Sequence, residues 1–264
     1  MIKEENFRGT FYPDSKDEVL RYFDHFNKIL EDVKLDLKAP FEPKAIISPH
    51  AGYIYSGFSA NIAYKIASYK EYQRVVIIGP SHRVYLDGAS VALYDGYSTP
   101  FGEIEVDLEY SKKLISRFKE LTFEANAHKE HSTQTQIPFI KYYFPKSKIV
   151  EIVYGKIGYQ SLAKMIEYIL SQKDTLLVIS TDLSHFYTQK EANELDSICI
   201  NAIANKNLDM LDMGCEACGM IGLKAILDIA IKQDFNTKVL DYRTSFDASG
   251  DDSSVVGYTS AIIG

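Results

Sequence analysis

Three short, mainly apolar runs, each followed closely by a histidine, constrain the fold of this chain more than any other feature. The runs cover residues 44–48, 74–78 and 175–180, and the histidines that follow them are His50, His82 and His185. Each run has the length of a strand that is buried on both faces, and helical patterns flank it. Ligands of an open α/β sheet bind beyond the carboxyl ends of its strands, so three histidines at that edge can converge. We interpret them as a metal or acid–base site, although a single histidine there would be read as an ordinary polar strand end.

Strands and helices alternate along the rest of the chain. Helical patterns cover residues 108–120, 158–171, 190–204 and 217–232, and further strand patterns cover residues 148–153, 237–242 and 255–263. This alternation predicts an α/β protein whose central sheet is largely parallel or mixed and is flanked by helices. Residues 35–43 contain two prolines and are expected to form a linker within the domain. Without a fixed repeat or a Gly/Ser-rich linker, residues 1–264 are predicted to form one domain.

Composition excludes several classes of partner. The chain has 46% hydrophobic residues, enough for a sizeable core, and a net charge of −7. An acidic chain without a basic patch is not expected to bind nucleic acid or an anionic membrane surface. No apolar run approaches the roughly 18 residues of a membrane-spanning helix, and the charged first six residues lead to no signal-peptide core. A cytoplasmic location is therefore expected.

His50 and His82 are the best pair of metal ligands, because each follows a proline-containing turn at the end of a buried strand. The candidates for a third ligand are Asp182, His185, Asp247, Asp251 and Asp252. Two histidines and one carboxylate form the facial triad of non-heme Fe(II) enzymes. The last three candidates follow a predicted strand, but composition alone would make them a solvated polar loop.

His131 and His185 suit a different task, since a histidine beside a metal-bound substrate can move protons near neutral pH. Asp182 precedes His185 by three residues and could orient its imidazole if a helical turn begins there. His131 lies in a predicted loop that leads into a helix.

The three cysteines do not resemble the disulfide framework of a secreted protein, because their number is odd and two form a C-x-x-C motif. They are Cys199, Cys215 and Cys218. At a helix start, Cys215 and Cys218 could form a redox pair or half of a zinc site, but we favour two small residues that pack there. No phosphate-binding glycine loop and no G-x-S-x-G nucleophile motif occurs.

Several sequence blocks, in order along nearly the whole chain, resemble the Memo family. They are residues 48–53, 79–82, 130–132, 180–185 and 252–255, supported by residues 9–13 and 217–219. The resemblance implies a fold similar to that of the class III extradiol, or LigB-like, dioxygenases, in which two histidines and a carboxylate hold Fe(II). It also implies metal-binding and redox-linked behaviour, and family members in animals bind phosphotyrosine peptides.

By the same resemblance, His50 and His82 are the first two metal ligands and Asp247 aligns with the third. Some members carry cysteine at that third position, which would favour a softer ion such as Cu(I). With Asp247, Fe(II) is the expected cofactor, and Cu, Zn or Mn are the alternatives. His185 is similar in place to the catalytic histidine of the dioxygenases, and His131 is expected to line the pocket.

Tyr53, Tyr55 and Asp182 are expected at the substrate, with packing as the alternative role of the tyrosines. The expected function is thus that of a metal-binding Memo-family protein with a dioxygenase-like site and oxidoreductase activity on an unknown substrate. The alternative is a non-catalytic module that binds a peptide or protein in the same pocket; metal-assisted hydrolysis is a third hypothesis without specific support. The partners implied by the resemblance are AMMECR-type and radical-SAM proteins.

Overall fold

The structure is a computed structural model that describes residues 1–4, 6–33 and 37–264. Its main sheet has nine strands within these residues, in the order β10-β12-β2-β9-β3-β8-β4-β7, with β11 paired to β12. The strands are β2 (Ala45–Ser48), β3 (Arg74–Pro80), β4 (Ala89–Val91), β7 (Leu121–Thr122), β8 (Lys148–Tyr154), β9 (Thr175–Ser180), β10 (His185–Tyr187), β11 (Thr237–Thr244) and β12 (Val255–Ile263). The central strands β2, β9, β3 and β8 are parallel, whereas β12 runs antiparallel to β2, and β4 runs antiparallel to β8 but parallel to β7. The predicted largely parallel or mixed sheet is confirmed.

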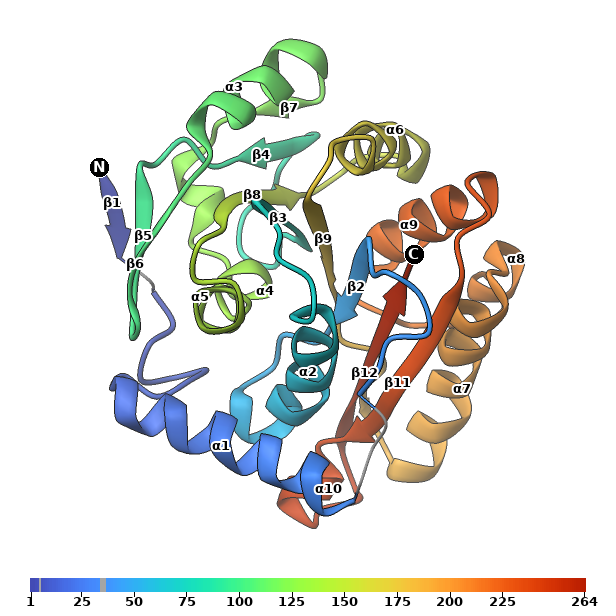
Figure 1. The fold of residues 1–264 in the computed structure, drawn as a ribbon. Helices are drawn as coiled ribbons and strands as arrows, with labels where there is room; N and C mark the ends of the chain where they lie inside the picture. Colours follow the sequence, from blue (N-terminus) through green and yellow to red (C-terminus); the bar gives the residue numbers. More distant parts are fainter. Residues whose placement is uncertain (5, 34–36) are drawn as a thin grey trace.

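Helices cover both faces of this sheet (Figure 1). They are α1 (Lys16–Asp32), α2 (Tyr53–Ala67), α3 (Leu108–Arg117), α4 (His131–Gln134), α5 (Ile137–Tyr143), α6 (Tyr159–Leu170), α7 (Gln189–Asn205), α8 (Leu208–Leu211), α9 (Met220–Lys232), α10 (Phe246–Ser249) and the short 3-10 helix η1 (Ala125–His128). One hydrophobic core lies between the sheet and α6, α7 and α9, and a second lies between the sheet and α1, α2 and α5.

Successive residues of one strand enter different cores. Ile46 belongs to the core beside α2, and its neighbour Ile47 belongs to the core beside α9. Ile77 and Ile78 of β3 divide in the same way. Because successive strand side chains point to opposite faces, a strand covered on both sides needs apolar residues at every position. This explains why the central strands appear in the sequence as unbroken apolar runs.

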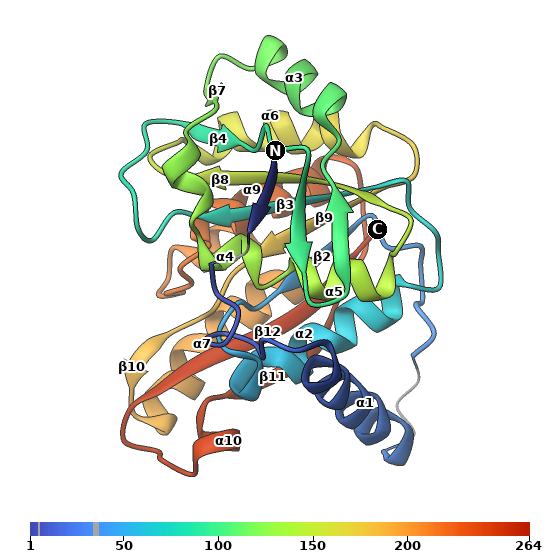
Figure 2. The same cartoon turned by 90° about the vertical axis from the view of Figure 1, so that its left-hand side faces the viewer.

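A second, three-stranded sheet packs beside the main one and contains β1 (Ile2–Glu4), β5 (Gly96–Thr99) and β6 (Gly102–Glu105) (Figure 2). A turn at residues 99–102 joins β5 to β6, and Gly102 has a φ of 94°, which favours glycine. Of the predicted linker, residues 35 and 36 lie outside the described part of the chain. Among the described residues, no helix combines the length and apolar character needed to cross a membrane.

The topology brings the predicted site residues to one edge. The strands β2, β3 and β9 are parallel neighbours, so the segments that follow Ser48, Pro80 and Ser180 leave the sheet at the same end. Those segments carry His50, His82 and Asp182.

Candidate metal centre

His50, His82 and Cys218 converge at the carboxyl edge of the sheet. One ligand atom from each of the three lies within 4.8 Å of the others. The Nε2 atom of His50 is 3.4 Å from the Sγ atom of Cys218, and the two imidazole rings are 5.3 Å apart. These side chains come from the ends of β2 and β3 and from the segment that precedes α9, so three distant parts of the chain build one group of metal donors.

Ser180 fixes the tautomer of His50. The Ser180 hydroxyl donates to the carbonyl of Ser132, so its oxygen can only accept from His50 Nδ1, which lies 2.9 Å away. The proton therefore sits on Nδ1, and Nε2 faces Cys218 with a free lone pair. The backbone N–H of His50 also donates to Oδ1 of Asp182 at 2.7 Å. Burial lowers the pKa of His50 to about 4, partly offset by the charge of Asp182, so the ring is neutral at neutral pH.

Glu130 holds His82 through both of its carboxylate oxygens. The backbone N–H of His82 donates to Oε2 at 2.7 Å, and His82 Nδ1 lies 3.0 Å from Oε1. Because an ionised carboxylate only accepts, Nδ1 carries the proton and Nε2 remains for a metal ion. Burial raises the pKa of Glu130, but interactions with His131 and His82 outweigh burial and hold this pKa well below its usual range.

His131 lies beside the donor group, where the sequence predicted a pocket residue. Its ring is 4.5 Å from that of His82 and 5.4 Å from that of His50. Its Nδ1 is 2.8 Å from Glu130 Oε1, although the two are not aligned for a hydrogen bond. The His131 ring also packs on Phe11, whose ring centre is 4.8 Å away. The set His82, Glu130 and His131 is a second, overlapping group of potential metal ligands.

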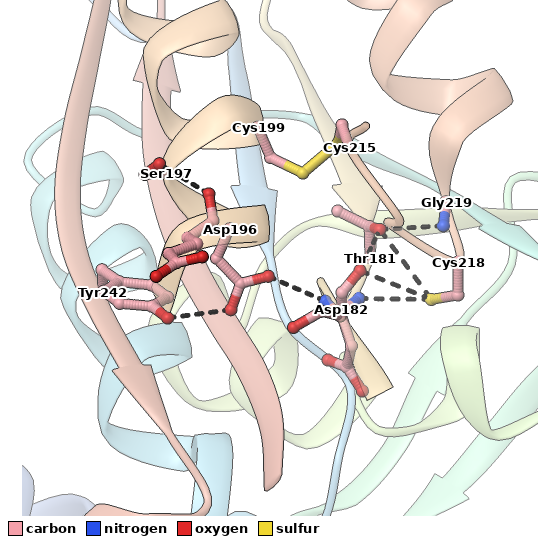
Figure 3. The surroundings of a disulfide bond; sticks show 11 residues. Thr181, Asp182, Asp196, Ser197, Cys199, Cys215, Cys218, Gly219 and Tyr242 are labelled. Carbon is pink, nitrogen blue, oxygen red and sulfur yellow. Dashed lines mark hydrogen bonds between the residues drawn. A yellow bond between two sulfur atoms is a disulfide. The ribbon is translucent and has the colours of Figure 1, made fainter. Parts of the chain in front are cut away.

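Short contacts to the end of β9 hold Cys218 in place. The N–H of Asp182 donates to Sγ at 3.3 Å, the N–H of Cys218 donates to the Asp182 carbonyl at 3.2 Å, and the N–H of Gly219 donates to Thr181 Oγ1 at 2.8 Å (Figure 3). A Cβ atom at Gly219 would lie 2.5 Å from that of Thr181, so only glycine permits this approach. Burial and the Asp182 charge raise the pKa of the Cys218 thiol to about 12. A bound cation would reverse that effect, since metals deprotonate the thiols that coordinate them.

The model of the family described as Memo-like protein matches residues 3–262 of the chain. The chain belongs to the Memo family. A MEMO1 family protein of Aquifex aeolicus is 34% identical to it over 275 residues, covering 99% of this chain and 98% of that protein. A MEMO1 family protein of Methanobrevibacter smithii is 32% identical and covers 99% of both chains. An uncharacterized protein, JW3007 of Escherichia coli K12, shares the fold with a TM-score of 0.52 at 11% identity, over 83% of this chain and 98% of that one.

In this Memo-family protein Asp247, the predicted third ligand, belongs to neither group of potential metal ligands among the described residues. Asp247 lies in α10, is exposed, and accepts a hydrogen bond from the N–H of Thr244 at 2.9 Å. It follows β11, which is separated from β2 by β12. The prediction placed Asp247 at the correct end of a strand, but that strand is at the edge of the sheet. Asp251 and Asp252 are exposed as well, and the third side chain in the group with His50 and His82 is Cys218.

His185 also lies apart from the three clustered imidazoles. It begins β10 and pairs with Val256 of β12, and its ring contacts Phe186 at 5.8 Å. The predicted pairing with Asp182 required a helical turn, but residues 182–184 form no helix and His185 begins a strand. The Asp182 carboxylate instead accepts from the backbone of His50, and its Oδ2 lies 3.8 Å from His50 Nε2. Asp182 is therefore part of the centre, next to a donor.

The two tyrosines that follow His50 differ in environment. Tyr53 is buried, its ring packs at a tilt against that of Phe139 with the ring centres 4.7 Å apart, and its hydroxyl donates to the carbonyl of Thr135. These contacts are those of a packing residue, the alternative role considered for it. Tyr55 is 42% exposed at the start of α2 and is the one of the two that can reach a ligand in solution.

The C-x-x-C motif is divided between two tasks. Cys215 forms a disulfide with Cys199 of α7, whereas Cys218 is a free thiol (Figure 3). Neither a Cys215–Cys218 redox pair nor simple packing of both residues describes this arrangement. The disulfide ties the segment that carries Cys218 to α7, three residues before Cys218.

Sequence reasoning missed Glu130, Ser180 and Cys218 as parts of the centre. Glu130 directly precedes His131, and Ser180 ends a predicted strand, so both had a positional signal. Cys218 is preceded by Cys215, and the C-x-x-C spacing directed attention to a cysteine pair rather than to a cysteine beside histidines.

Proposed function

We propose that this Memo-family chain is a metalloprotein that holds one iron or copper ion with His50, His82 and Cys218 and performs redox chemistry on a bound substrate. The observation that carries the proposal is the convergence of these three donors within 4.8 Å. Ser180 binds Nδ1 of His50, and Glu130 binds Nδ1 of His82. Nε2 of each imidazole therefore remains available to coordinate a metal ion.

The donor set selects the class of metal. Two imidazole nitrogens and a thiolate suit copper, iron and zinc, whereas magnesium, calcium and manganese prefer oxygen ligands. With Cys218 in place of Asp247, the harder ion Mn(II) no longer fits the site, and Cu(I) joins Fe(II) as a leading candidate. When bound, iron or copper supplies a Lewis acid and an electron donor or acceptor next to the substrate.

The number and exposure of the donors favour a catalytic site over a structural one. Structural zinc sites usually have four protein ligands, whereas catalytic sites keep a position open with three. His50 is 1% exposed, but the side chains of His82 and His131 are 30% and 17% exposed, so the centre reaches solvent on their side. A substrate can approach from that side.

His131 is placed for acid–base work in such a reaction. Its Nδ1 lies 2.8 Å from the buried Glu130 carboxylate, which places this nitrogen away from the open side of the site. The other ring nitrogen can then accept a proton from a substrate hydroxyl and return it. Glu130 thus serves both rings: it orients His82 as a donor and supports His131 as a base.

Anaerobic titration of the metal-free protein with Fe(II) and, separately, with Cu(I) tests the proposal. We expect one ion per chain with either metal or both, and at least a tenfold weaker affinity in Cys218→Ser. Asp247→Ala is the matched control and should bind like the wild type. Failure of the wild type to bind either ion would overturn the proposal.

Oxygen uptake by the loaded protein with a panel of catechols tests the oxygenase form of this chemistry. His131→Gln should slow a metal-dependent uptake by about 10²- to 10⁴-fold without removing the metal, the usual contribution of a general base. Tight metal binding without uptake for any catechol would favour the peptide- or protein-binding role instead.

A further inference from the structure

A second polar cluster lies in the core behind the metal centre and has no part in the proposed chemistry. Its members are Ser90, Tyr97, His128, Thr133 and Glu151, all of them buried. Glu151 of β8 accepts hydrogen bonds from His128 Nδ1 at 2.8 Å, from Thr133 Oγ1 at 2.5 Å and from the hydroxyl of Tyr97. Burial raises the pKa of Glu151, but His128 and the two hydroxyl donors outweigh burial and keep it below the ordinary value.

A charged carboxylate is an expensive choice for this position. Removing an ion from water costs several kcal/mol, and apolar residues often serve stability equally well in place of a buried ion pair. Glu151 and His128 are both 0% exposed, and the other residues of β8 from Ile149 onward are buried and mainly apolar. The buried carboxylate and its imidazole partner therefore indicate a role other than simple stabilisation of the core.

The cluster has the connectivity of a catalytic triad but not its access. Ser90 Oγ lies 2.8 Å from His128 Nε2, and His128 Nδ1 contacts Glu151, the order found in serine hydrolases. However, Ser90 is 0% exposed, and its hydroxyl oxygen already accepts from the N–H of Glu124 at 2.8 Å. A substrate cannot reach a nucleophile in this position, so hydrolysis is excluded.

Glu151 binds His128 and Thr133, which flank Glu130 and His131 in the sequence. His128 precedes them, and Thr133 follows them. Thr133 Oγ1 also lies 3.2 Å from the Glu130 carbonyl, and the segment is closed further by Gln134, whose Nε2 donates to the His128 carbonyl at 2.6 Å. The backbone on both sides of Glu130 is thus anchored to β8.

We infer that Glu151 is a positioning residue: by holding His128 and Thr133 it places Glu130, and through Glu130 it orients His82 and His131. Glu130 alone can connect Glu151 to the two histidines, because the Glu130 carboxylate contacts both the His82 and the His131 imidazoles. The inference rests on the proposed function only where it treats His82 as a metal donor.

Nitrogen NMR of the histidine rings in the metal-free protein tests the inference directly. In Glu151→Gln, and in the nearly isosteric Thr133→Val, the ring resonances of His82 and His131 should shift relative to the exposed His25. Tyr97→Phe is the matched control, because it removes one hydrogen bond to Glu151 and keeps those from His128 and Thr133. It should leave His82 and His131 unchanged.

Unshifted His82 and His131 resonances in a folded Glu151→Gln protein would overturn the inference; if that variant does not fold, the same result in Thr133→Val would do so. Affinity for Fe(II) or Cu(I) gives a second readout. We expect about a tenfold loss in Glu151→Gln and none in Tyr97→Phe, at the lower end of the effects of outer-shell partners.

The two readouts separate this inference from the proposed function. If the wild type binds neither ion while the resonances shift as expected, the metal proposal fails and the positioning role stands. If the wild type binds metal and the resonances do not shift, the metal proposal stands and the positioning role fails.

Discussion

The sulfur of Cys218 lies 3.4 Å from Nε2 of His50, although the two residues are 168 positions apart in the chain. This contact joins the end of β2 to the segment that leads into α9. The sulfur lies next to Nε2, the His50 nitrogen that carries no proton because Ser180 binds the other one. A metal ion placed between them would be coordinated by the imidazole lone pair and by a thiolate. The relationship defines a centre with nitrogen and sulfur donors instead of the carboxylate expected from the sequence.

Glu130→Gln should reduce the acid sensitivity of the metal-free protein. The pKa of Glu130 is lower in the folded protein than in the unfolded chain, so its stabilising contribution is present above about pH 4.3 and is lost as the pH falls further. Urea unfolding at about pH 6 and about pH 3 should therefore show a smaller loss of stability in Glu130→Gln than in the wild type. Equal losses in both proteins would contradict the role given to Glu130.

Burial of neutral His50 should make the metal-free protein lose stability as the pH falls, in a higher pH range than for Glu130. Its folded pKa of about 4 lies below the ordinary histidine value, so the unfolded chain takes up a proton first as the pH falls. Stability is then lost between about pH 6.5 and about pH 4, with about 3 kcal/mol attributable to this residue. His50→Gln should lack that component and His25→Gln should retain it; identical profiles in all three proteins would refute the assignment.

The Cys199–Cys215 disulfide should be detectable by counting thiols. In denaturant without reductant, a thiol reagent should find one reactive group per chain, Cys218, and after reduction it should find all three. The double variant Cys199→Ser, Cys215→Ser should lose about 3 kcal/mol of unfolding free energy, as expected for a loop of this length. Three reactive thiols in the unreduced protein would show that the disulfide does not form.

The fold was predictable to a large extent because its central strands are buried on both faces. Unbroken apolar runs such as residues 74–78 mark such strands, and the first helix carries a recognisable cap, in which Ser15 accepts from the N–H of Glu18. The strand β10 at His185 was not predicted, since it is three residues long and its pairing with β12 depends on a segment about 70 residues away. A local sequence pattern cannot predict a pairing between segments this far apart.

The site was predictable only where it depends on the parallel strands. His50 follows β2 and His82 follows β3, and these two strands lie on either side of β9 in the sheet. The convergence of the two histidines therefore follows from the pattern of parallel strands. The third ligand depends on the order of strands, which the sequence does not reveal, and Asp247 follows a strand at the edge. Cys218 can lie beside His50 because its neighbour Gly219 has no side chain and so packs closely against Thr181. This contact joins residues far apart in the chain, so a local sequence pattern does not reveal it.

Metal content by mass spectrometry, on protein purified without added metal, tests the central claim most directly. The proteins to compare are the wild type, Cys218→Ala and Asp247→Ala. We predict about one iron or copper ion per chain in the wild type and in Asp247→Ala, and a small fraction of that amount in Cys218→Ala. Loss of the metal in Asp247→Ala with full retention in Cys218→Ala would contradict the account.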